Sequence, residues 1–322
     1  MNNRVFRLLI FTLVFFVFAG NSPLAAKKKL KIAMILWRGE TQAEIGFKDG
    51  LKELNYSAEY VVKDAGQDIK KLGVLLGELK PEFDELDYIY TFGTTVSRRT
   101  RVIVNDRIPQ IFNVVTDPVG AGIVRNTKSP GANISGVSYA IPIFLQIKTA
   151  LKVFKFNKLG IFFNPREKNT MIIRQELYNV AKDLDFEVID LRIPPLQKKL
   201  QENLQKLVDG SILVDAVYLP SDSFLVSNAK LIGSQLRTAK IKSIGEIMSF
   251  IENGVLMGVV IDYYELGKAV AKIVDRNQKG EKLQDIPIEK IKKTSLVINK
   301  TTSDILNIKI PEAILKKTTI VK

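Results

Sequence analysis

The 322-residue chain carries one order of apolar strands and amphipathic helices twice, at a nearly constant interval. The apolar run Lys31-Ile-Ala-Met-Ile-Leu36 is matched 127 residues later by Lys158-Leu-Gly-Ile-Phe-Phe163. Two more pairs of segments recur at intervals of 130 and 127 residues, namely 52–56 with 182–186 and 87–92 with 214–219. Short apolar strands resemble one another by chance, but the constant spacing favours two similarly built halves.

Each half alternates strands with helices. In the first half, apolar runs predict strands at residues 31–36, 58–62, 87–92 and 110–115. Ala43, Phe47 and Leu51 between the first two strands have helical spacing, and helices are also expected at 68–80 and 95–105. Strands and helices in this order form right-handed βαβ units around a parallel sheet. The sequence therefore predicts an α/β fold of two Rossmann-like lobes with parallel sheets, joined by a multi-strand hinge.

Three segments are expected to cross between the lobes. Residues 138–146 lead from the first lobe into a helix of the second, and the strand 255–261 precedes a helix that returns at 263–277. A strand at 294–298 crosses again. We therefore assign residues 27–138 and 262–293 to the N-terminal lobe, and 139–261 and 294–322 to the C-terminal lobe. Several crossings make a hinge that permits closure on a ligand.

The N-terminus has the pattern of a secretory signal peptide. Arg4 and Arg7 precede the apolar run Leu8–Phe18, and small residues follow up to Ala26. An uncleaved anchor is the alternative, but eleven apolar residues fall short of the roughly 20 that span a bilayer. We expect residues 1–26 to be a signal peptide cleaved near Ala26. Because the chain has no cysteine, we expect no lipid anchor or disulfide, and a mature protein free in the periplasm.

Composition argues against several other classes of function. The net charge of +14 raises the possibility of nucleic-acid binding, but the lysines are spread over helix faces without interleaved aromatic residues. The chain contains no histidine and no cysteine, so imidazole bases and thiolate nucleophiles are excluded. Gly120-Ala-Gly122 lacks the third glycine of a dinucleotide fingerprint, since Arg125 stands there. We therefore expect no nucleic-acid partner, no cofactor and no enzymatic activity.

Ligands of open parallel sheets lie beyond the carboxyl ends of the strands. The segments that follow the predicted strands therefore supply the candidate site residues. These candidates are Trp37, Gly93, Thr94, Thr95, Thr116, Asp117, Ser221, Asp222, Glu246 and Asp262.

Gly93-Thr94-Thr95 opens a predicted helix and is the most informative of these segments. Glycine allows close approach of a ligand to the backbone, and the free N–H groups of a helix N-terminus attract anions. Simple capping of the helix by Thr94 or Thr95 is an equally weighted alternative. Arg98 and Arg99 follow one turn later and either lie on the exposed surface or reinforce anion binding.

Acidic and aromatic candidates lie at other strand ends. Asp222 and Glu246 are positioned to pair with an ammonium group of a ligand. The alternatives are that Asp222 caps the helix starting near Ser223 and that Glu246 lies on a surface helix. Trp37, the only tryptophan, either stacks on a ligand or belongs to the core.

Several blocks of the sequence resemble a known family. They include Thr116-Asp-Pro-Val-Gly-Ala-Gly122, Ser129–Ser138, Phe92-Gly93-Thr94, Asn164-Pro165, Pro220-Ser-Asp222, Ile261–Gly267, Lys279-Gly-Glu281 and Leu296-Val-Ile-Asn299. In this order they resemble ABC-transporter substrate-binding proteins of the tryptophan/tyrosine-type uptake family. The resemblance implies the type I periplasmic-binding fold, with a ligand held between the lobes. It also implies an ABC transporter permease as the partner.

The function that we expect is a periplasmic solute-binding component of an ABC importer, which acts as a monomer on a small-molecule ligand. The resemblance favours an amino acid and among these an aromatic one. The chain departs from the family pattern at Thr95–Arg99 and at Gly245–Met248, and both segments touch the predicted pocket. A periplasmic sensor that presents its bound form to a membrane receptor is the alternative, on the same fold.

Overall fold

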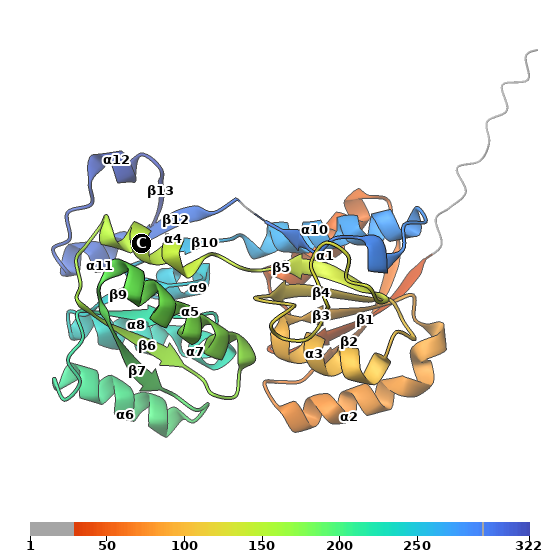
Figure 1. The fold of residues 1–322 in the computed structure, drawn as a ribbon, viewed down its shortest axis with the longest axis horizontal. Helices are drawn as coiled ribbons and strands as arrows, with labels where there is room; N and C mark the ends of the chain where they lie inside the picture. The colour runs from red at the N-terminus through yellow and green to blue at the C-terminus, as the bar shows by residue number, and fades with distance from the viewer. Residues whose placement is uncertain (1–28, 292) are drawn as a thin grey trace, which may run out of the picture.

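A computed structural model describes residues 29–291 and 293–322. The predicted signal peptide and its cleavage site near Ala26 lie outside these residues. The described chain forms two lobes that lie side by side, each built on one sheet (Figure 1). In this part of the chain, no helix combines the length and the apolar character needed to cross a bilayer.

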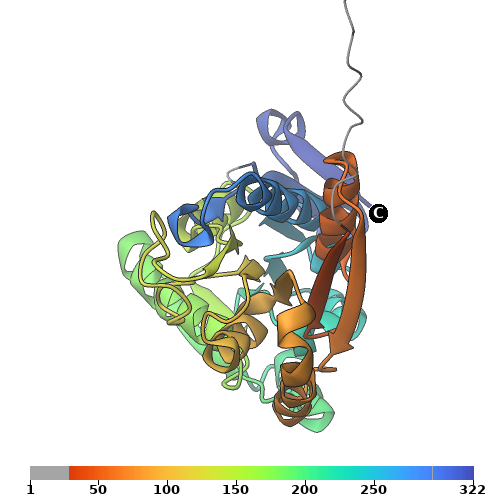
Figure 2. The ribbon, with the colours of Figure 1, turned by 90° about the vertical axis from the view of Figure 1, so that its right-hand side faces the viewer.

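The N-terminal lobe has a six-stranded sheet in the order β11-β5-β4-β3-β1-β2, with every neighbouring pair parallel. Its strands are β1 (Leu30–Leu36), β2 (Ala58–Asp64), β3 (Tyr88–Phe92), β4 (Gln110–Val115), β5 (Ile134–Ser138) and β11 (Glu289–Lys290). Its helices are α1 (Gln42–Glu53), α2 (Ile69–Leu79), α3 (Gly93–Val104) and α10 (Tyr263–Gln278). Figures 1 and 2 show α10 along one side of this sheet and α2 along the other.

Local chemistry fixes where these helices begin. The Thr41 hydroxyl accepts a hydrogen bond from the Ala43 N–H at 3.1 Å, and the Glu44 carboxylate accepts one from the Thr41 N–H at 2.7 Å. This reciprocal capping box satisfies N–H groups at the start of α1 that would otherwise lack partners. The Asp68 carboxylate likewise accepts hydrogen bonds from the first turn of α2.

The C-terminal lobe has a seven-stranded sheet in the order β13-β12-β10-β9-β8-β6-β7. Its strands are β6 (Lys158–Phe163), β7 (Glu187–Arg192), β8 (Ala216–Leu219), β9 (Lys242–Gly245), β10 (Met257–Val260), β12 (Ser295–Asn299) and β13 (Thr318–Val321). Its helices are α4 (Ile143–Leu151), α5 (Lys168–Leu184), α6 (Gln197–Val208), α7 (Ser223–Ser227), α8 (Ala229–Thr238), α9 (Met248–Glu252), α11 (Lys300–Ile305) and α12 (Glu312–Leu315). Leu159 and Ile161 of β6 belong to the apolar cluster with α4 and α5, whereas Phe162 belongs to the cluster with α6 and α8. This alternation is that of a strand buried on both faces.

The two lobes repeat one strand order. The cores β2-β1-β3-β4-β5 and β7-β6-β8-β9-β10 are parallel and correspond strand for strand. The predicted fold class is therefore confirmed. One feature was not predicted: β12 pairs with β10 in the antiparallel direction, because an apolar run of strand length carries no information on strand direction.

The chain passes between the two sheets three times, after β5, after β10 and after β11. Aromatic residues of the first two passages meet at the centre. Tyr139 follows β5 and Tyr263 follows β10, and their rings pack edge to face with centroids 5.4 Å apart. These passages position the carboxyl ends of both sheets opposite each other, which is where the candidate site lies.

Candidate functional site

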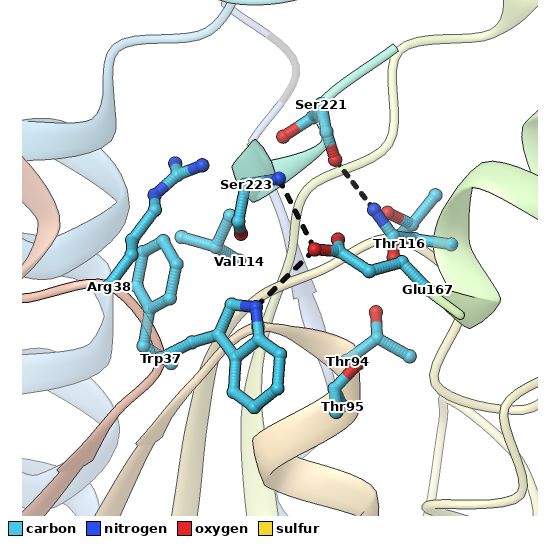
Figure 3. A pocket seen from close by; sticks show the side chains of 12 residues that line it. Trp37, Arg38, Thr94, Thr95, Val114, Thr116, Glu167, Ser221 and Ser223 are labelled. Carbon is cyan, nitrogen blue, oxygen red and sulfur yellow. Dashed lines mark hydrogen bonds between the residues drawn. The ribbon is translucent and has the colours of Figure 1, made fainter. Parts of the chain in front are cut away.

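A pocket lies between the carboxyl ends of the two sheets (Figure 3). The N-terminal lobe contributes the ends of β1, β3 and β4 and the first residues of α3 to its walls, and the C-terminal lobe contributes the segments after β6 and β8. About 380 Å³ of this space is free of protein atoms, part of it open to solvent. Ligands of doubly wound sheets bind at this position because several loops converge there.

Glu167 is the acidic side chain of the pocket. It occupies the N-cap position of α5, yet within the described chain its carboxylate makes no capping bond to that helix. Instead its Oε1 accepts hydrogen bonds from the Trp37 indole N–H and from the Ser223 N–H, both at 3.3 Å (Figure 3). Trp37 comes from the opposite lobe, so this contact spans the cleft.

Asp222 lies close enough to Glu167 to affect its pKa and is fully buried. Its Oδ1 accepts a hydrogen bond from the Leu225 N–H at 2.7 Å, so the predicted capping of a helix by Asp222 is confirmed for α7. Burial and the nearby charge of Asp222 raise the pKa of Glu167 to about 8, and burial raises the pKa of Asp222 to about 6. Two carboxyl groups that share little water resist double ionisation, so a cation at this place is favoured.

Arg38 is the basic side chain of the pocket. It follows β1, and its guanidinium carbon lies 5.2 Å from the centroid of the Phe92 ring. Its positive charge lowers the pKa of Glu167 and of Asp222, although less than burial raises each of them. Among the described residues that line the pocket, Arg38 and Glu167 are the two that carry charge.

The N-terminus of α3 faces the same pocket. Gly93 has a left-handed φ of +80°, a conformation that favours glycine, and it begins the helix ahead of Thr94 and Thr95. The N-cap residue is Phe92, and in the described chain no side chain caps the helix. The alternative prediction, that Thr94 or Thr95 simply caps this helix, is therefore wrong. The first N–H groups of α3 remain available to an anion, next to the two hydroxyl groups.

Val114 lines the pocket in a strained conformation. Its φ of +56° is unusual for a β-branched residue, and the register between β4 and β5 shifts between Phe112 and Val115. The Asn113 side chain accepts a hydrogen bond from the Val114 N–H at 2.9 Å and holds this bulge. Bulges of this kind reorient a side chain at a functional site.

The pocket brings together six of the ten predicted site residues, which are Trp37, Gly93, Thr94, Thr95, Thr116 and Ser221. Asp117 and Asp262 lie outside this lining. The Asp117 carboxylate accepts hydrogen bonds from Val119 and Gly120 in its own turn. The Asp262 carboxylate accepts one from the Tyr264 N–H and caps α10. Each of these two acids therefore has a local structural task.

Glu246 lies behind the pocket, in the segment that follows β9. The alternative prediction, that Glu246 lies on a surface helix, is wrong, because Glu246 is only 2% exposed. Its carboxylate accepts a hydrogen bond from the Ser221 N–H at 2.5 Å, and its carbonyl oxygen accepts one from the Tyr139 hydroxyl. Burial raises the pKa of Glu246 to about 7. Glu246 thus supports the loop that carries Ser221.

The lobes touch across the cleft. Besides the contact between Trp37 and Glu167, the Gln67 side-chain amide donates a hydrogen bond to the Ser227 hydroxyl at 3.0 Å. Ser221 and Tyr263 add a third contact, with their oxygens 3.2 Å apart. These bonds join loops of both lobes directly, as expected of a closed arrangement.

The predicted site residues do not include Arg38 and Glu167, although both lie in or next to segments that follow predicted strands. Arg38 is adjacent to Trp37, and Glu167 follows Asn164-Pro165 by two residues. The rule that ligands lie beyond strand ends could have predicted both residues. Arg38 already lies in the segment Trp37-Arg38-Gly39 after the first strand, and extending Asn164-Pro165 by two residues would have included Glu167.

Residues 32–322 match the family model described as ABC transporter substrate binding protein, and the chain therefore belongs to that family. Proteins of this class bind small-molecule ligands and deliver them to the permeases of ABC transporters.

Particular relatives extend this result. A tyrosine-binding protein of Clostridioides difficile (strain R20291) is 29% identical over 224 residues, which are 68% of this chain and 62% of that protein. The alignment thus spans less than two thirds of that relative. An ABC domain of Streptococcus pneumoniae solved in complex with L-Trp is 24% identical, with a TM-score of 0.84 over 92% of this chain and 100% of the other. A leucine-binding protein of Thermotoga maritima has a TM-score of 0.59 at 15% identity, over 78% and 83% of the two chains. These folds confirm the predicted type I periplasmic-binding architecture.

Proposed function

We propose that the protein is the periplasmic solute-binding component of an ABC importer and that it binds an amino acid, with aromatic amino acids favoured, in the cleft between its lobes. The observation that carries this proposal is that the pocket contains one basic and one acidic side chain, Arg38 and Glu167, among otherwise neutral residues. Arg38 and the N-terminus of α3 suit a carboxylate, and Glu167 suits an ammonium group. A zwitterion supplies both groups at once.

The desolvation of these groups explains why a zwitterion is favoured over a neutral solute. Glu167 is 7% exposed and Thr94 is 5% exposed, so a ligand between them is removed from water on both sides. A buried charge without a partner is costly, and a complementary charge on the ligand removes that cost. Trp37 and Phe92 add flat apolar surface on which an aromatic side chain can pack.

The relatives support the same class of ligand. The tyrosine-binding protein and the protein solved with L-Trp bind aromatic amino acids, as their names state. The proposed export to the periplasm follows from the pattern of residues 1–26, and a monomer suffices because one chain supplies both walls of the pocket.

A screen of the natural amino acids on protein stripped of ligand tests the proposal. The protein is unfolded in urea, dialysed and refolded, and each amino acid is then added in a thermal-shift assay. A ligand present at 100 times its dissociation constant should add about 2.7 kcal/mol to the free energy of unfolding. We expect L-tryptophan or L-tyrosine to give the largest shift. Tryptamine and indole-3-propionate, which each lack one charged group, should give much smaller shifts.

The contrary result is equally clear. If none of the natural amino acids raises the melting temperature of the refolded protein, while a neutral solute such as a sugar does, the ligand is not a zwitterion. N-terminal sequencing of the protein recovered by osmotic shock tests the export separately, with a start near Lys27 as the expected result.

A further inference from the structure

A second, wider hollow opens next to the pocket and shares Thr94 and Thr95 with it. Four basic side chains line this hollow. Arg98 and Arg99 come from α3 of the N-terminal lobe. In the C-terminal lobe, Lys168 is the first residue of α5 and Arg166 lies in the loop just before this helix. Both lobes therefore contribute positive charge to one side of the cleft.

None of the four cations forms an ion pair with any residue in 29–291 or 293–322. Their neighbours on the same helices behave differently. Arg101 of α3 pairs with Asp106 at 3.1 Å, and Arg174 of α5 donates to Asp190 with its Nε at 2.8 Å. The four cations that line the hollow thus differ from these two neighbours in having no ion pair within the described chain.

No described aspartate or glutamate lines this hollow. The acids that line the adjoining spaces, Glu167 and Asp68, have other partners. Glu167 accepts hydrogen bonds from Trp37 and Ser223, and Asp68 accepts them from the first turn of α2. The positive charge of the hollow is therefore not neutralised by the protein itself.

Closure of the cleft brings like charges of the two lobes toward each other. Their mutual repulsion opposes closure, whereas an anion held between them reverses the sign of the interaction and joins the lobes. Guanidinium groups suit this task, because their planar array of donors binds carboxylate and phosphate oxygens in pairs.

We propose that this hollow binds an anionic group of the phosphate, sulfate or carboxylate type, which bridges Arg98 and Arg99 to Arg166 and Lys168 and favours the closed form. The group is either a substituent of the molecule in the central pocket or a free inorganic anion. This site goes beyond the proposed function, which needs only the charges of Arg38 and Glu167.

The experiment compares two probes on the refolded protein by isothermal titration at constant ionic strength. The first probe is inorganic phosphate, and the second is O-phospho-L-tyrosine set against L-tyrosine. The test variant is Arg98→Gln with Arg166→Gln. The control variant is Lys230→Gln with Lys272→Gln, which also removes one exposed cation from each lobe but lies away from the cleft hollows.

We expect a probe that carries phosphate to bind the parent and the control variant alike, and to bind the test variant about tenfold or more weakly. Binding of phosphate alone identifies a free anion as the occupant. Tighter binding of O-phospho-L-tyrosine than of L-tyrosine, without binding of phosphate alone, identifies a substituent of the ligand. Two results would overturn the inference. In the first, inorganic phosphate does not bind the parent and O-phospho-L-tyrosine binds it no more tightly than L-tyrosine does. In the second, the test and control variants show the same change in affinity for the phosphate-bearing probe.

The outcome is separable from that of the proposed function. If L-tryptophan and L-tyrosine bind the parent while phosphate contributes nothing, the amino-acid function stands and this site does not exist. If phosphate binds through Arg98 and Arg166 while no amino acid binds, the anion site stands and the amino-acid function fails.

Discussion

Glu167 and Asp222 place two carboxyl groups out of water at one point of the cleft wall. Folding must offset the cost of this arrangement, and the empty protein does so by keeping a proton on the pair. Arg38 compensates only in part, since the pKa of Glu167 remains raised in its presence. The proposed ligand ammonium group would let the proton leave and would stabilise the ionised form of the pair.

The stability of the empty protein should therefore fall as pH rises. The pKa of Glu167 is about 8 in the folded state and near its ordinary value of 4.5 in the unfolded state. Between these values the folded state holds a proton that the unfolded state has released, so the free energy of unfolding decreases with rising pH. The Glu167→Gln variant should lose much of this slope and gain on the order of 2 to 4 kcal/mol at pH 8.

Urea unfolding of the refolded, ligand-free protein at pH 5, 6.5 and 8 measures this effect. The exposed Glu252→Gln on α9 is the matched control and should keep the slope of the parent. Equal slopes for the parent and for Glu167→Gln would show that the buried pair does not hold the proton.

The site could be predicted in part from strand ends alone. Thr94 and Trp37 were predicted because ligands of parallel sheets bind beyond the carboxyl ends of the strands, and both residues line the pocket. Whether an acidic residue is buried or exposed could not be predicted from its place at a strand end. Asp222 and Asp262 were both predicted to contact the ligand and both cap helices in the structure, yet one is fully buried and the other exposed, because their surroundings are set by tertiary packing.

At the level of elements, α1 and α10 cross at very short range. A Cβ atom on Gly46 would lie 2.1 Å from the Tyr264 carbonyl oxygen, and one on Gly267 would lie 2.1 Å from the Ala43 carbonyl oxygen. The absence of side chains at these two positions lets the backbones of the helices touch. This contact fixes α10, and with it Tyr263, against the N-terminal lobe.

Gly267→Ala should therefore destabilise the protein by about 1 to 3 kcal/mol through overpacking. Gly77→Ala is the control, because Gly77 is exposed on α2 and its Cβ would meet no described atom within 4 Å. Removing a glycine from an open helical position should stabilise by about 0.5 to 1 kcal/mol. In urea unfolding, we expect Gly267→Ala to lower the free energy of unfolding and Gly77→Ala to raise it. An equal decrease in both variants would contradict the close helix contact.

Most elements followed from periodicity, and the exceptions have physical causes. The six-residue apolar runs at β1 and β6 are strong signals because both faces of these strands are buried. The helix expected at 95–105 starts earlier, at Gly93, since the left-handed glycine turns the chain directly from β3 into α3. The two-residue strand β11 is too short to produce a pattern.

At the level of the whole molecule, the repeated strand order and three passages between the sheets make the two lobes separate bodies with a common hinge. In the structure the hinge is closed by bonds such as that from Gln67 to Ser227. A ligand that contacts both lobes would strengthen the closed form by its differential affinity for that form.

Small-angle scattering of the refolded protein should therefore show a smaller radius of gyration after addition of the amino acid that gives the largest thermal shift. The Gln67→Ala variant removes one direct bond between the lobes and should make the empty protein more open, with little change in the saturated form. An unchanged radius of gyration on saturation of the parent would contradict ligand-driven closure.

The pairing of Glu167 with a ligand amine is the central claim, and a thermodynamic cycle measured by isothermal titration tests it most directly. The tightest-binding amino acid and its analogue without the α-amine are titrated into the parent and into Glu167→Gln at pH 8. In the parent, loss of the amine should cost about 2 to 5 kcal/mol, because the ligand loses its charge-assisted hydrogen bond to Glu167 and the buried carboxyl group must take up a proton instead. In Glu167→Gln the same loss should cost at least about 1 kcal/mol less, which is the coupling expected of groups in contact. An equal cost in both proteins would show that the amine does not bind at Glu167.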